Sequence, residues 1–263
     1  MKLSISNIAW GKEQDIEMYE YLSEVGFDAI EIAPTRIFEE KPYEKLEEAK
    51  RFAKGLEEKY KLKISSMQSI WYGRAEKIFG SKEERKALIE YTKKAIDFAH
   101  TIDCGNLVFG CPKNRNINTP EDYKTAIEFF KEIGEYAKQK NTVFAIEPNP
   151  TIYNTNFINK TEEALKIVKE ISCDAVKVNL DLGTVIENEE DIISIIENNY
   201  DKINHIHISE PNLESIQKRE LHKKLAQKLK ENNYQRYISI EMKNQNDIEK
   251  VKEIINYVKG VFE

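Results

Sequence analysis

The chain has 263 residues, of which 40% are hydrophobic and 33% charged, and its formal net charge is −6. One hydrophobic core can still serve a chain of this length, and the composition is that of a globular protein and excludes disordered and collagen-like classes. The acidic balance gives no net attraction to phosphate backbones, so no nucleic acid is expected as a partner.

Short apolar or β-branched segments alternate with longer amphipathic segments along the whole chain. The candidate strands are LSISNI (3–8), AIEIAP (29–34), KISSMQSI (63–70), NLVFG (106–110), TVFAIEP (142–148), VKVNLDL (176–182), INHIHIS (203–209) and YISIEM (237–242). Parallel strands need a crossover helix between them, so this rhythm predicts a single (β/α)8 TIM barrel domain over residues 1–263. A doubly wound open sheet is the alternative, but no glycine-rich phosphate loop is present.

Several segments between the strands carry helix signals. Residues 43–60 repeat apolar residues at intervals of three and four, which predicts a helix with one buried face. Thr119 as N-cap and Pro120 after it predict the start of another helix, and Thr161 opens a third before two glutamates. The longest segments without periodicity, roughly 69–81, 110–119 and 148–160, each follow a strand, where a barrel builds its active face.

Four potential metal ligands stand at the carboxyl ends of the last four predicted strands. They are Glu147, Asp181, His207 and Glu241. Because the strands of a parallel barrel end at a similar height, inward-facing side chains at these positions converge on one point. Three carboxylates and an imidazole suit one divalent ion, with Mn²⁺, Mg²⁺, Co²⁺ and Zn²⁺ all compatible.

Other charged residues near these strand ends have more than one interpretation. His205 lies two residues before His207 on the same face, where it either supports the site by hydrogen bonding or fills the barrel. Glu210 is a supporting partner of the site or a surface charge. Glu31 and Arg36 flank the end of the second strand, where an ion pair that orders the loop is favoured over substrate contact.

The units GFDAIEIAPTRIF, QSIWYGRAEKIFG, AIEPNPTIYNTNF, NLDLGT and HIHISEP resemble the sugar phosphate isomerase/epimerase superfamily of xylose isomerase-like barrels. The four candidate ligands are separated by 34, 26 and 34 residues, close to the ligand set of ketose 3-epimerases. The resemblance implies a TIM barrel with one metal ion. It also implies that Glu147 and Glu241 are the catalytic acid/base pair, moving a proton next to a carbonyl through an enediolate.

The chain departs from the ketose 3-epimerase pattern at three positions that contact sugar hydroxyls in that group. Tyr153 stands where an acidic residue is usual, Thr184 where a histidine is usual and Leu213 where an arginine is usual. The candidate metal ligands therefore match the pattern, but the residues at the sugar-hydroxyl positions do not. No particular ketose is predicted.

Candidate substrate-binding residues lie in two loops. They are Gln68, Trp71, Tyr72 and Arg74 after the third strand, and Lys113 and Arg115 after the fourth. Aromatic rings stack on sugars and the cations suit a phosphate or carboxylate. Trp71 fits the core or the rim equally well, and Lys113 and Arg115 fit solvated loop charges equally well.

The leading hypothesis is a metal-dependent isomerase or epimerase acting on a small-molecule sugar or sugar phosphate. A keto-inositol dehydratase on the same barrel and a non-catalytic sugar-binding barrel are the alternatives. The AP endonuclease branch uses three ions and more histidines, and this chain has four histidines in all.

The cysteines and the first residues bear on the cellular compartment. Cys104, Cys111 and Cys173 are odd in number and lack C-x-x-C spacing, which predicts neither a disulfide framework nor a zinc ribbon. The start MKLSISNIAW lacks the apolar core of a signal peptide, and no stretch reaches the length of a membrane span. We expect a cytoplasmic protein without a membrane partner, and a homo-oligomer is compatible with the sequence.

Overall fold

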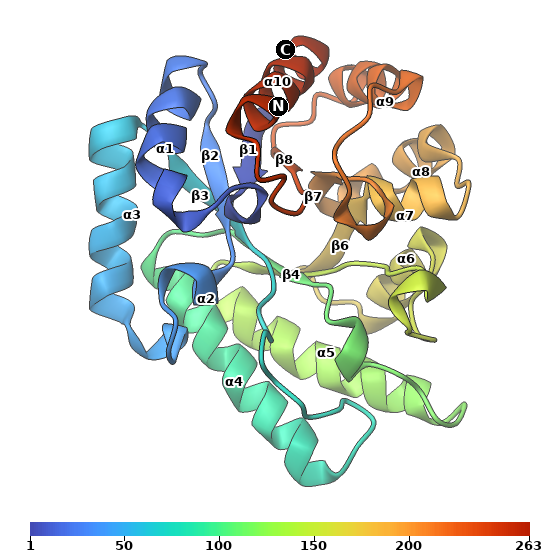
Figure 1. The fold of residues 1–263 in the computed structure, drawn as a ribbon. Helices are drawn as coiled ribbons and strands as arrows, with labels where there is room; N and C mark the ends of the chain where they lie inside the picture. Colours follow the sequence, from blue (N-terminus) through green and yellow to red (C-terminus); the bar gives the residue numbers. More distant parts are fainter.

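A closed parallel barrel of eight strands occupies the centre of the molecule (Figure 1). The computed structural model describes residues 1–263. The strands are β1 (Lys2–Ser6), β2 (Ala29–Ile32), β3 (Lys63–Met67), β4 (Asn106–Phe109), β5 (Val143–Ile146), β6 (Val176–Asp181), β7 (Ile203–Ile208) and β8 (Tyr237–Ile240). Each lies within a predicted segment or overlaps it, which confirms the predicted (β/α)8 barrel.

Helices surround the barrel and cover the outer faces of the strands (Figure 1). They are α1 (Asp15–Glu24), α2 (Pro34–Ile37), α3 (Leu46–Tyr60), α4 (Lys82–Thr101), α5 (Asp122–Gln139), α6 (Thr161–Ile171), α7 (Leu182–Glu187), α8 (Ile192–Asn199), α9 (Glu220–Glu231) and α10 (Ile248–Phe262). None of them has both the length and the apolar character needed to cross a bilayer.

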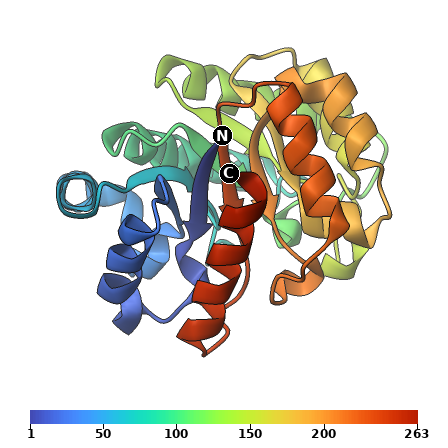
Figure 2. The same cartoon turned by 90° about the horizontal axis from the view of Figure 1, so that it is seen from above.

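The barrel closes where β1 pairs in parallel with β8, Leu3 opposite Ile238 and Ile5 opposite Ile240. This pairing rules out the open doubly wound sheet. It also brings the two ends of the chain together, so the start of β1 and the end of α10 lie near each other in both views (Figures 1 and 2). The apolar side chains of strands and helices form one continuous core.

One helix begins differently from the sequence expectation, and another begins as expected. Thr119 is not the N-cap of α5, which starts at Asp122. The Asp122 carboxylate instead accepts hydrogen bonds from the backbone N–H groups of Asn118 and Thr119, at 2.7 and 3.0 Å, and holds this segment as a turn before the helix. Thr161 is the first residue of α6, as expected for the residue that opens it.

Polar residues line part of the barrel interior. Ser4, Ser66, Asn106, Asn179 and Ser239 are all buried on the strands. Asn106 donates to Ser66 Oγ at 2.9 Å, so part of this polar set is hydrogen-bonded across neighbouring strands. Buried polar groups require hydrogen-bond partners of this kind. The polar residues of the barrel interior support the charged groups at the carboxyl ends of the strands.

Candidate active site

The four predicted ligands lie together at the carboxyl end of the barrel. Glu147 follows β5, Asp181 ends β6, His207 lies near the end of β7 and Glu241 follows β8. One donor atom from each lies within 4.8 Å of the others, and none of the four residues is more than 8% exposed. The common height of the strand ends thus gathers four groups that are far apart in the sequence.

His207 presents its two ring nitrogens to different carboxylates. Nδ1 lies 3.0 Å from Glu147 Oε1 and 3.0 Å from Glu241 Oε2. Nε2 lies on the other side of the ring, 3.0 Å from Glu31 Oε2. Asn179 Nδ2 is 2.7 Å from Glu147 Oε1 and 3.1 Å from His207 Nδ1, so this amide holds both groups. The nitrogen that faces the other predicted ligands is therefore Nδ1.

Asp181 is oriented by its own loop and by β7. Its Oδ2 accepts hydrogen bonds from the backbone N–H of Thr184 at 2.7 Å and from the Thr184 hydroxyl at 2.8 Å. Ser209 Oγ donates to Oδ1. Thr184 is fully buried, and its hydroxyl also lies 2.9 Å from the carbonyl oxygen of Pro148. The residue that replaces the usual histidine therefore positions a predicted ligand.

A glycine allows the Glu147 carboxylate to take its place. A Cβ atom at Gly110, just after β4, would lie 2.6 Å from Glu147 Oε2, closer than any side chain tolerates. Asn149 Nδ2 donates to the same oxygen at 3.3 Å. A larger residue at position 110 would have to displace this carboxylate, so the glycine leaves the Glu147 side chain in its place.

The clustered carboxyl groups have shifted pKa values. Burial, and then the negative charge of Glu147, raises the pKa of Asp181 to about 6. Burial raises the pKa of Glu241 to about 7, and the charges of Glu147 and Glu31 add to this against the opposing effect of His207. Burial disfavours charge on His207, but Glu241 and Glu31 outweigh burial and raise its pKa well above the ordinary value.

The donor set fits a single divalent ion. Two unit charges about 4 Å apart interact by about 4 kcal/mol at an effective dielectric constant of about 20, so converging carboxylates are stabilised by a nearby cation. Carboxylate oxygens with one imidazole nitrogen suit hard or borderline divalent ions. Glu147, Asp181, His207 and Glu241 are therefore a group that could hold a metal ion.

Three of the four predicted ligands, Glu147, Asp181 and Glu241, line a cavity of about 220 Å³ at the barrel mouth. Gln68 lines it, as do Tyr153 and Leu213, two of the residues that depart from the ketose 3-epimerase pattern. Glu210 also lines it, but its carboxylate binds the Arg219 guanidinium, at 2.7 Å from Nε. Glu210 is thus paired with a cation of its own.

Three of the other candidate substrate residues lie away from this cavity. Trp71 is in the hydrophobic core, where its Nε1 donates to Thr92 Oγ1 at 2.8 Å, so the core interpretation fits its position. Lys113 is exposed and does not line the cavity. Arg115 is fully buried, and its guanidinium donates to the carbonyl oxygens of Glu147 at 2.8 Å and Ile158 at 3.2 Å.

Tyr72 and Arg74 line an adjoining groove of about 790 Å³, which shares Ile8 and Ser69 with the cavity. Tyr72 is 71% exposed. The Arg74 guanidinium is paired with Glu76 and lies 4.7 Å from the centre of the Tyr91 ring. The loop after β3 therefore builds the entrance beside the cavity.

Arg115 is expected to be important for stability because it satisfies two buried carbonyl oxygens. Burial lowers the pKa of Arg115 to about 10, which still leaves the side chain charged at neutral pH. Changing Arg115 to Met removes both hydrogen bonds, so the free energy of unfolding should fall by roughly 2–4 kcal/mol. Urea denaturation measures this change. Lys113→Met, in the same loop but exposed, should change it by less than about 0.5 kcal/mol, and equal losses would contradict the assignment.

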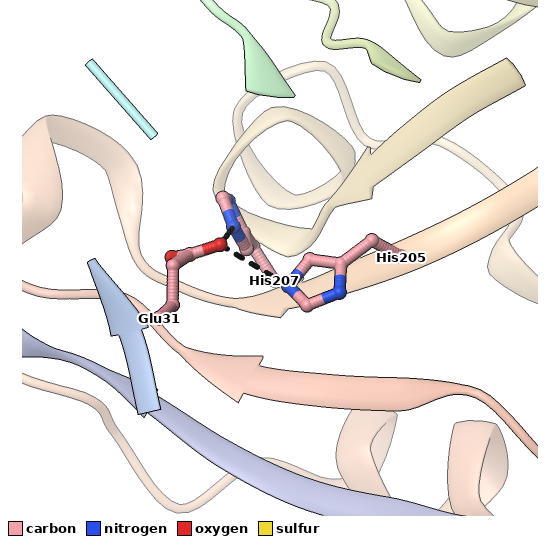
Figure 3. A group of neighbouring side chains, drawn as sticks. All are labelled: Glu31, His205 and His207. Carbon is pink, nitrogen blue, oxygen red and sulfur yellow. Dashed lines mark hydrogen bonds and ion pairs between the residues drawn. The ribbon is translucent and has the colours of Figure 1, made fainter. Parts of the chain in front are cut away.

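The expected Glu31–Arg36 pair does not form. Arg36 binds Asp15 instead, with Nη2 2.7 Å from Oδ1. Glu31 is fully buried and points to the histidines of β7 (Figure 3). The sequence offered a signal, since Glu31 is a charged residue at an inward position of an otherwise apolar strand, but its partners come from a strand far away in the chain.

The fold and the site define a (β/α)8 barrel with a carboxylate and imidazole cluster at the carboxyl ends of β5 to β8. The chain belongs to the xylose isomerase-like TIM barrel family, whose model matches residues 19–260. This confirms the family resemblance of the sequence.

Solved structures with the same fold have different activities. They include apo 3-keto-D-glucoside 4-epimerase from E. coli (TM-score 0.79, 19% identity, 99% of each chain) and D-psicose 3-epimerase from Clostridium cellulolyticum H10 (TM-score 0.80, 16% identity, 100% of each chain). A family 2 AP endonuclease from Brucella melitensis has a TM-score of 0.75 at 19% identity over 93% of each chain. At such identities the likeness shows the fold alone. No curated protein matches the chain.

Proposed function

We propose that the protein is a divalent-metal-dependent sugar isomerase or epimerase that moves a proton next to a carbonyl through an enediolate. The observation that carries the proposal is the convergence of Glu147, Asp181, His207 and Glu241 within 4.8 Å at the barrel mouth. Two sugar epimerases among the structures of the same fold support it. A divalent ion held by these groups supplies positive charge to oxygen atoms of the sugar.

Glu147 and Glu241 are the proposed acid/base pair. They lie at the ends of β5 and β8, which are separated around the barrel by β6 and β7, so they approach the cavity from different directions. Removal by one carboxylate and return by the other gives epimerisation.

The charges around the cavity favour an uncharged sugar over a sugar phosphate. The cavity wall includes Glu147, Asp181, Glu210 and Glu241 and contains no lysine or arginine. A phosphate brings up to two negative charges and usually binds to arginine, lysine or backbone N–H groups. The arginines of the adjoining groove, Arg36 and Arg74, are already paired with carboxylates.

Solvent exchange tests the proposal. The protein is incubated in D₂O with Mn²⁺, Co²⁺ or Mg²⁺ and a panel of free ketoses, their phosphates and inososes, and deuterium in the recovered compounds is measured by mass spectrometry. We expect deuterium at the carbon next to the carbonyl of at least one free sugar, together with its epimer or isomer. A dehydrated product would identify the dehydratase instead.

Two results would overturn the proposal. A sugar that binds in calorimetry but takes up no deuterium with any of the ions would make the protein a binding barrel. Cleavage of a DNA duplex at an abasic site, without exchange into any sugar, would assign it to the endonuclease activity.

A further inference from the structure

The Glu31 carboxylate points to the imidazoles of His205 and His207 (Figure 3). Its Oε2 is 3.0 Å from His207 Nε2 and 3.2 Å from His205 Nε2. Glu31 and His207 are fully buried, and His205 is 1% exposed. The contact joins β2 to β7, on different sides of the barrel, so no local sequence relationship produces it.

The contact determines which nitrogen of His207 is free to bind a metal. A neutral imidazole has one N–H and one lone pair, on different nitrogens. A carboxylate at hydrogen-bond distance from Nε2 favours the proton there, because an ionised carboxylate can only accept. Nδ1 also lies 3.0 Å from two carboxylates, Glu147 and Glu241, but these would be bound to the ion in the metal-loaded protein. Glu31 is then the carboxylate left to accept a proton from the ring, and the lone pair is on Nδ1. Asn179 Nδ2, 3.1 Å from Nδ1, is placed to donate to the same lone pair.

We infer that Glu31 is a positioning residue that holds the Nε2–H tautomer of His207 and so directs Nδ1 to the metal. The inference rests on the proposed metal site and assigns a residue that touches neither substrate nor ion. A carboxylate behind a ligating histidine fixes the ring and increases its basicity, and loss of such a partner typically weakens metal binding about 10- to 100-fold.

Glu31, His205 and His207 could alternatively hold an ion of their own. That ion would need the Nε2 lone pair of His207, and a neutral ring cannot offer a lone pair at Nε2 and at Nδ1 together. The two sites are therefore mutually exclusive for a neutral His207. The site at the mouth has four donors, three of which line the cavity, whereas the group with Glu31 has three donors and none of them lines it.

Metal-binding measurements on variants test the inference without any substrate. Titration of the full-length protein with Co²⁺, followed by its absorption spectrum, should give one ion per chain. Glu31→Gln should weaken the affinity about 10- to 100-fold. Glu210→Gln is the matched control, since it removes the same charge from a carboxylate that lines the cavity and is paired with Arg219, and it should weaken binding less than about threefold.

Two further variants separate the two possible sites. Asp181→Asn should lose most Co²⁺ affinity while His205→Gln keeps it within about tenfold. Loss of binding in His205→Gln with retention in Asp181→Asn would assign the ion to the group with Glu31 and overturn the inference. Wild-type affinity in Glu31→Gln would also overturn it.

Nitrogen NMR of the Zn²⁺-loaded wild-type protein provides a test that does not depend on the variants folding. With only four histidines in the chain, the His207 signals can be assigned as those of the ring whose nitrogen signal shifts most when Zn²⁺ is added to the metal-free protein. We expect a proton on Nε2 and none on Nδ1, and a proton on Nδ1 would overturn the inference. If this tautomer and the Co²⁺ results hold but no sugar exchanges deuterium, the proposed activity fails while the role of Glu31 stands.

Discussion

Changing Glu241 to Gln is expected to lower the rate of deuterium exchange into the sugar by about 10²- to 10⁴-fold, the usual contribution of a positioned acid or base. The amide keeps the size of the side chain and an oxygen for the metal, but it cannot accept the proton. Exchange is measured at a metal concentration that saturates the variant, so that a weaker metal affinity does not affect the comparison.

Asp181→Asn is the matched control for this prediction. It alters another proposed metal ligand, whose oxygens are held by Thr184 and Ser209, but it removes no group of the proposed acid/base pair. At saturating metal it should exchange at least about tenfold faster than Glu241→Gln. If Glu241→Gln exchanges within about tenfold of the wild type, the residue has no role as acid or base.

Metal affinity should rise steeply with pH. Asp181, with a pKa of about 6, Glu241, with a pKa of about 7, and His207, whose pKa is raised well above its ordinary value, must each lose a proton to bind an ion. Between pH 5 and 7 the Co²⁺ affinity should therefore increase at least about 10²- to 10³-fold. Competition with a metal indicator at constant ionic strength measures this slope.

The same shifts predict how the metal-free fold responds to pH. In the folded protein both carboxyl groups have pKa values above their ordinary values of 3.8 and 4.5, so the folded state binds their protons more tightly than the unfolded chain does. The stability that this proton binding contributes is lost as the pH rises to about 7. The rise in melting temperature caused by Co²⁺ should grow over this interval. In Asp181→Asn the Co²⁺ affinity should rise less steeply with pH than in the wild type. An equally steep rise would show that protons on Asp181 do not compete with the metal.

The fold could be predicted from the sequence because its signals are local. The segment YISIEM alternates side chains with the period of a strand, and residues 43–60 repeat apolar residues with the period of a helix. Strands that are joined in parallel through helices can be arranged in only a few ways, so the order of strands and helices predicts the barrel. Helix starts were less accurate: the Asp122 carboxylate holds the backbone at Asn118 and Thr119 in a turn, and α5 therefore begins after the predicted cap.

The barrel and the candidate ligands can be predicted from the chain alone, because strand ends in a closed parallel barrel must meet at one rim. The surroundings of those ligands can be described only from the folded protein. Arg115 proved to hold backbone carbonyls, and Glu31 contacts His207 across the barrel, 3.0 Å apart. Contacts of this kind depend on the register and closure of strands distant in the chain, and no periodicity along the sequence carries that information.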